Sequence, residues 1–123
     1  MSKQRISLGK WGEDAAVNYL RHAGFKIVAR NYQHKFGEID IVASKDSTFI
    51  FIEVKTRSSV RYGHPAEAIT YRKKRQISKA ALAYVTRHQL TEYPVRFDVV
   101  SVIKKPQGAE ISHLESAFEA VLS

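Results

Sequence analysis

The sequence predicts an α/β fold in which helices flank a mixed β-sheet, in the order α-β-β-β-α-β with a candidate short final strand. Two observations carry this prediction. Segments with helical spacing of apolar residues are interleaved with segments that alternate or run apolar. The length of 123 residues allows one domain with a real core and is too short for two ordinary ones. We therefore expect a single domain over residues 1–123, with its core at about residues 8–104.

Two segments have the apolar spacing of amphipathic helices. Leu8–Ala23 places small and apolar residues at i, i+3, i+4 and i+7, between a candidate Ser7 cap and Gly24. The second helix is expected from Pro65, which suits a first helical turn, to His88. Its predicted buried stripe consists of Ile77, Ala80, Ala81, Tyr84 and Val85.

The strands are predicted from alternation and from β-branched and aromatic residues. They are Phe25–Tyr32, Glu38–Ala43, Phe49–Arg57, Val95–Ile103 and the short final strand near Ile111–Leu114. The polar group Ser44–Ser47 between the second and third strands indicates a tight hairpin. Ser58–His64 is polar and contains a glycine, so a loop is expected there.

The positive charge is concentrated in one segment. The net charge is +8, and Val54–Leu90 holds nine basic residues against the single acid Glu67, which accounts for the whole excess. Such asymmetry indicates a polyanion partner, although a solvated basic helix would have the same composition. The basic residues are Lys55, Arg57, Arg61, Arg72, Lys73, Lys74, Arg75, Lys79 and Arg87.

The sequence excludes several other classes of protein. Met1–Lys10 lacks the apolar core of a signal peptide, and the longest apolar run, Phe49–Ile52, is far too short to span a bilayer. The absence of cysteine excludes a disulfide framework and a thiolate metal site. We therefore expect a cytoplasmic protein that has no membrane partner.

The hairpin brings two carboxylates together. If its loop consists of Asp46 and Ser47, equal steps outward place Asp40 opposite Glu53 on one face. Their Cβ atoms would then stand ~5 Å apart, where like charges destabilise a sheet. We therefore expect a positive group nearby, and Lys55 points to the same side as Glu53 by the period of two.

This grouping suits metal-dependent hydrolysis of a phosphodiester. Two carboxylates offer hard oxygen ligands to Mg²⁺ or Mn²⁺, and the ion lowers the pKa of a bound water. Lys55 can hold that water or stabilise the growing charge on the phosphate. The alternative is a structural ion pair of Lys55 with Asp40 and Glu53 in an ordinary sheet.

The motifs around these residues resemble a known family. Gly37-Glu38-Ile39-Asp40-Ile41-Val42, followed by Phe51-Ile52-Glu53-Val54-Lys55-Thr56-Arg57, resembles the PD-(D/E)XK nucleases, the restriction-endonuclease-like fold. Together with Gly9–Glu13, Ala29–Tyr32 and Arg96–Val100, these motifs more closely resemble the uncharacterised YraN-like bacterial proteins, which are similar to Holliday junction resolvases. The resemblance covers residues 9–102, with Ile39 where the superfamily name has proline.

The resemblance implies roles for individual residues. Asp40 and Glu53 match the metal-binding acids and Lys55 the catalytic lysine. Glu13 matches an additional acidic ligand of resolvase-like members, and it lies at the edge of the first helix's buried stripe. An exposed carboxylate in a first helical turn is the alternative for Glu13.

The same resemblance implies contacts with nucleic acid. Arg57 and Arg61 follow the active strand, and related nucleases approach the substrate with their second core helix. Sequence-independent phosphate contacts are expected, although each side chain could also be a solvated surface residue. The predicted contact residues are Arg57, Arg61, Tyr71, Arg72, Arg75, Gln76 and Lys79.

The leading hypothesis is therefore a Mg²⁺- or Mn²⁺-dependent nuclease that hydrolyses phosphodiester bonds of nucleic acid. Its narrower form is a structure-specific, resolvase-like DNA endonuclease, and the sequence leaves both DNA and RNA open as substrates. One alternative is a nucleic-acid-binding module of the same fold without turnover. Another is an interaction domain whose basic helix meets an acidic protein. Analogy with resolvases suggests a homodimer.

Overall fold

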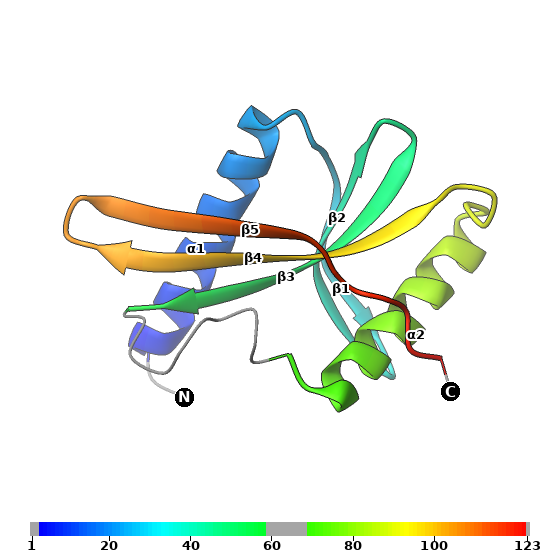
Figure 1. Ribbon diagram of the computed structural model, residues 1–123. Coiled ribbons are helices and arrows are strands. Elements are labelled where there is room, and N and C mark those ends of the chain that lie inside the picture. The colour runs from blue at the N-terminus through cyan, green and yellow to red at the C-terminus, as the bar shows by residue number, and fades with distance from the viewer. Residues whose placement is uncertain (1–2, 59–68, 123) are drawn as a thin grey trace.

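The chain folds around one five-stranded β-sheet with a helix against each face, as the computed structural model shows (Figure 1). The structure describes residues 3–58 and 69–122. The predicted order of elements and the mixed α/β class are confirmed. The elements are α1 (Lys3–His22), β1 (Lys26–His34), β2 (Gly37–Lys45), β3 (Thr48–Arg57), α2 (Tyr71–Arg87), β4 (Val95–Lys105) and β5 (Gly108–Phe118).

The strands lie across the sheet in sequence order, from β1 to β5. Neighbouring strands are antiparallel except β3 and β4, which run parallel. A parallel pair needs a crossover connection, and α2 lies in that connection. β5 is much longer than the short final strand predicted at Ile111–Leu114.

The β2–β3 hairpin has the two-residue loop expected from the sequence. Asp46 and Ser47 both have positive φ, 51° and 62°, as a type I′ turn requires. From this loop the strands pair in step as far as Ile41 and Ile52. The next residue on each strand is one of the two central carboxylates, so the loop length positions the candidate site.

The hydrophobic core consists of two clusters, one on each face of the sheet. On one face Ile52 packs with Leu20 of α1, and on the other Phe51 packs with Ile77 of α2. Successive residues of β3 thus face opposite layers, as the two-residue period of a strand requires. Both faces of the central strands are covered by a helix.

The start of α1 differs from the prediction, whereas its end agrees. The helix begins at Lys3, so Ser7 lies inside it and is not the cap. Serine is tolerated in a helix interior, and the sequence alone did not mark the true start. At the other end Gly24 has a φ of +92° and the Phe25 N–H donates to the Leu20 carbonyl at 2.9 Å, the Schellman arrangement.

The predicted start of the second helix at Pro65 is also wrong. α2 begins at Tyr71, because Thr70 is extended and its Oγ1 accepts a hydrogen bond from the Lys73 N–H at 3.1 Å. Pro65 itself and all of the predicted Ser58–His64 loop after Ser58 lie outside the described residues. No helix in the described part of the chain is both long and apolar enough to cross a membrane.

Candidate active site

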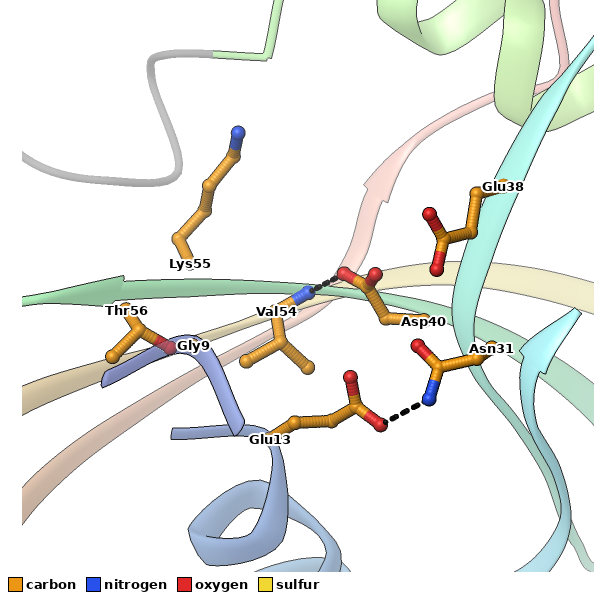
Figure 2. Close-up of a pocket in the computed structure, with 8 residues that line it drawn as sticks. All are labelled: Gly9, Glu13, Asn31, Glu38, Asp40, Val54, Lys55 and Thr56. Atoms are coloured by element: carbon orange, nitrogen blue, oxygen red, sulfur yellow. Dashed lines mark hydrogen bonds between the residues drawn. The ribbon is translucent and has the colours of Figure 1, made fainter. Parts of the chain in front are cut away.

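The site begins where the β2–β3 ladder ends. Beyond Ile41 and Ile52 the two strands are no longer paired. Instead the Val54 N–H donates a hydrogen bond to Asp40 Oδ2 at 2.8 Å (Figure 2). A side-chain oxygen therefore accepts from the β3 backbone, which orients the Asp40 carboxylate against that strand.

The sheet twists at the same point. Ile39 and Ile41 lie two residues apart on β2 yet pack in opposite cores, with α2 and α1 respectively. In β1, Asn31 has a φ of 53°, a left-handed conformation that asparagine adopts more readily than most residues. Asp40 lies between the two isoleucines, so it is directed into neither core.

Asp40 lines an open pocket of about 380 Å³. Figure 2 shows the carboxylates of Glu13, Glu38 and Asp40 pointing toward the same space, from α1 and β2. The fold thus brings together three predicted site residues, Glu13, Asp40 and Lys55, and adds Glu38 and Asn31, which sequence reasoning missed. The lining residues are Gly9, Glu13, Asn31, Glu38, Asp40, Val54, Lys55 and Thr56.

Glu53 is buried beside the pocket, between two lysines. Its Oε1 lies 3.9 Å from Lys55 Nζ and 3.8 Å from Lys73 Nζ, and its side chain is 8% exposed. Lys55 was expected near the carboxylates, whereas Lys73 of α2 was not assigned to the site. Its spacing of three residues from Gln76, which was expected to approach the site, is the signal that would have found it.

Glu13 reaches inward from α1. Arg30 Nε and Asn31 Nδ2 donate hydrogen bonds to its Oε1 at 3.1 and 3.0 Å, and its side chain is 15% exposed. Gly12 permits this approach, because a Cβ at that position would overlap the Thr56 side chain on β3. The second glycine of the Gly9–Glu13 motif therefore lets α1 lie close enough for Glu13 to join the pocket.

Burial raises the pKa of both central carboxyls. For Asp40 burial is the main cause and raises the pKa from 3.8 to about 6, although the Val54 hydrogen bond opposes it and nearby carboxylates add to it. For Glu53 burial and then the Asp40 charge raise the pKa from 4.5 to about 7, against the two lysines. Both groups therefore favour protonation or a bound cation near neutral pH.

The pocket has the donor chemistry that a hard divalent cation needs. Mg²⁺ prefers oxygen ligands and keeps several waters, so it requires few protein groups. Across residues 8–58 and 69–122 no three Asp, Glu, His or Cys side chains already stand close enough to hold an ion. Glu13, Glu38 and Asp40 of the pocket and the neighbouring Glu53 are the carboxylates that could hold one, with water completing its shell.

Several residues predicted to contact nucleic acid lie on open surface. Tyr71 is 63% exposed at the start of α2, and Arg72 and Arg75 are exposed in the same first turns. Arg57 is half-buried at the end of β3. Arg61 lies outside the described residues.

Gln76 and Lys79 contact the β1–β2 hairpin instead. A Cβ at Gly37 would stand 3.0 Å from Gln76 Cβ, so α2 lies directly against the start of β2. One turn later, Lys79 Nζ lies 4.9 Å from the centre of the Phe36 ring. These two side chains are therefore held against the hairpin and are less free than the arginines.

Asp98, a third buried carboxylate, provides a contrast. Arg96 donates two hydrogen bonds to it, each of 2.9 Å, so the two side chains form an ion pair. His113 Nε2 lies 2.7 Å from Oδ2, and a backbone N–H donates at 3.0 Å. Burial alone would raise the pKa of Asp98, but these hydrogen bonds hold it below the usual value. Both oxygens of Asp98 therefore have donors, whereas burial dominates at Asp40 and raises its pKa.

The proteins similar to this chain match it over nearly its whole length. The UPF0102 protein of Geobacter metallireducens is 46% identical over 119 residues, 97% of this chain and 98% of that protein. The UPF0102 protein of Syntrophotalea carbinolica is 45% identical over 119 residues, which are 97% of this chain and 97% of that protein. The UPF0102 protein of Persephonella marina is 40% identical over 111 residues, 90% of this chain and 92% of that protein. Residues 12–102 match the uncharacterised protein family UPF0102, which confirms the YraN-like resemblance, and the chain belongs to this family.

Proposed function

We propose that this chain is a metal-dependent nuclease that hydrolyses phosphodiester bonds of DNA and selects its substrate by structure. The observation that supports it most is the burial of Asp40 and Glu53 beside an acid-lined pocket, where their pKa values are raised in spite of the Val54 hydrogen bond and the two lysines. Asp98 has a smaller exposed fraction than Glu53, 0% against 7%, but it has four hydrogen bonds and a lowered pKa. A carboxylate pair that raises the free energy of the folded state is typical of a functional site.

The acids are the proposed ligands of Mg²⁺ or Mn²⁺. Asp40, Glu53 and Glu13 supply carboxylate oxygens, and the bound ion would polarise the phosphate and supply a nucleophilic hydroxide at neutral pH. The hydrogen bond from Val54 keeps Asp40 in place. The bonds from Arg30 and Asn31 do the same for Glu13, so both carboxylates are oriented before an ion binds.

The lysines are proposed to act on the substrate and on Glu53. Lys55 lines the pocket and is 28% exposed, so its ammonium group can approach a phosphate and stabilise charge that develops there. Lys73, at 3.8 Å from Glu53, balances part of the buried charge from the α2 side. Lys55 is thus the proposed catalytic lysine and Lys73 a positioning residue.

The basic surface of α2 supports a DNA substrate. Tyr71, Arg72 and Arg75 are exposed, and the chain carries a net charge of +8. Arginine contacts to phosphates give affinity without sequence information, which agrees with a nuclease that recognises shape. Arg57 at the end of the active strand is proposed to contact the strand that is cut.

The test is cleavage of a panel of labelled DNA and RNA, from single strands to four-way junctions, with Mg²⁺, Mn²⁺ or EDTA. Glu53→Gln and Lys55→Ala should each reduce cleavage at least about 100-fold, as loss of a charged catalytic group commonly does. Glu92→Gln and Lys26→Ala remove the same charges from exposed positions and should leave cleavage unchanged. Absence of metal-dependent cutting on every substrate would refute the proposal.

The same panel separates the two alternatives. DNA binding without cutting would favour a binding module of the same fold. Neither binding nor cutting would favour an acidic protein partner at α2. A resolvase-like cut of a two-fold junction further requires two active sites, so sedimentation with and without a four-way junction tests the proposed homodimer.

A further inference from the structure

An exposed aromatic residue precedes Glu38 of the candidate active site by two residues. Phe36 is at the tip of the β1–β2 hairpin and is 44% exposed. Lys79 Nζ and Lys35 Nζ lie 4.9 and 5.1 Å from the centre of its ring. The ring of His34 is next to it, 5.2 Å between centres. The hairpin tip therefore presents an aromatic surface with two cations beside it.

Phe36 forms part of an open groove of about 510 Å³ along α2. Leu82 and Leu122 contribute apolar surface and are 49% and 53% exposed. Lys35, Lys79 and Arg87 contribute positive charge, and no acidic residue of the described chain lines this groove. Its chemistry fits a ligand that has a flat apolar part and negative charge.

One face of α2 connects this groove with Glu53. Three residues of this face are spaced by three positions: Lys73, Gln76 and Lys79. Lys73 lies near Glu53, Gln76 lies against Gly37, and Lys79 lies over the Phe36 ring. The rise of a helix separates Lys73 from Lys79 by about 9 Å. That distance corresponds to about two or three stacked nucleotides at ~3.4 Å each. A DNA strand with a phosphate at the site would therefore reach Phe36 within a few nucleotides.

We infer that the Phe36 groove binds an unpaired nucleobase, so that the substrate is single-stranded or branched next to the cleaved phosphate. Stacking on an aromatic ring, with cations for the backbone, is how proteins bind single-stranded nucleic acid. A base inside a duplex has both faces covered by its neighbours and cannot stack on Phe36. The placement of this nucleobase next to the cleaved phosphate rests on the proposed nuclease function, whereas the binding of a nucleobase at Phe36 does not.

Charge argues against the other occupants of this groove. A second copy of the chain would bring another net charge of +8 to a surface that already carries three cations. An apolar helix of a partner protein would fill the leucine-lined part but would leave Lys35 and Lys79 without a counter-charge. A nucleotide satisfies both parts, since its base stacks and its phosphate pairs with the ammonium groups.

The experiment measures fluorescence anisotropy of a labelled oligothymidylate and of a blunt duplex, in EDTA so that no cutting occurs. Phe36→Leu should weaken single-strand binding about tenfold, within the range for one base–aromatic stack, and change duplex binding less than about twofold. Phe36→Tyr keeps the stacking surface and should bind like the wild type. Tyr93→Leu removes a similarly exposed aromatic residue elsewhere, 46% exposed, and is the matched control.

Four outcomes would overturn the inference. They are equal single-strand binding by wild type and Phe36→Leu, an equal loss on both ligands, no single-strand binding by the wild type, and self-association that Phe36→Leu abolishes in sedimentation. Because binding is measured without metal, the two proposals fail separately. Phe36-dependent binding without any cutting would refute only the nuclease, and cutting with Phe36-independent binding would refute only the stacking site.

Discussion

Replacing Glu53 by glutamine should make the metal-free protein more stable at pH 8. The carboxyl is buried, lies near Asp40 and has a pKa raised from 4.5 to about 7. Glutamine keeps the shape of the side chain and removes the charge. If the carboxylate is present for chemistry, the folded protein bears a cost that this substitution relieves.

The size and the sign of the effect follow from the pKa of Glu53. Because the pKa is higher in the folded than in the unfolded chain, unfolding free energy falls as pH rises from about 4.5 to about 7. Above pH 7 the full difference applies, about 3 kcal/mol. This value already includes the opposing attraction of Lys55 and Lys73, which lowers the pKa of Glu53. The gain in unfolding free energy should therefore be about 3 kcal/mol.

Thermal and urea unfolding followed by circular dichroism in EDTA measure this difference at pH 4, 6 and 8. At pH 4 both chains carry a neutral group and should unfold alike, while at pH 8 Glu53→Gln should melt about 12 °C higher. Glu92→Gln, at an exposed position, should match the wild type throughout. A less stable Glu53→Gln at pH 8 would refute the reasoning, since it would show a structural ion pair with the lysines.

Three further predictions concern the metal, the helix approach and the buried ion pair. At pH 8, Mg²⁺ in about tenfold excess over its Kd should stabilise the wild type by about 1.4 kcal/mol and Glu53→Gln much less, as melting in Mg²⁺ would show. Gly12→Ala should destabilise the fold by about 2 kcal/mol through its overlap with Thr56, and Thr56→Ala in the same chain should recover most of this in urea unfolding. Asp98→Asn should cost about 3 kcal/mol above pH 5, because it leaves Arg96 partly buried without its partner. Since the pKa of Asp98 is lowered in the folded chain, the stability that this group gives the wild type should be lost as pH falls below about 4. An Asp98→Asn variant that unfolds like the wild type above pH 5 would contradict a stabilising role of the Arg96–Asp98 ion pair.

The sequence predicted most of the fold because its signals were local. Apolar spacing identified both helices, and Gly24 marked the end of α1. The hairpin followed from two short polar loop residues, Asp46 and Ser47, and that loop length alone set which residues of β2 and β3 face each other. The motifs then placed the family correctly. Helix starts were less certain, since Ser7 and Pro65 are plausible first-turn residues in many contexts.

Only the tertiary structure decided how the site is assembled. The contacts of the site join residues that are far apart in the chain. The contact of Lys73 with Glu53 depends on how α2 lies on the sheet, and the contact of Glu13 with Asn31 depends on how α1 lies on it. Neither the twist at Asp40 nor the close approach at Gly12 is visible in a two-residue period. Residue types and strand register are local properties and can be read from the sequence. Burial, and therefore the raised pKa values and the joined pocket, arises from packing between distant segments, which only the folded chain defines.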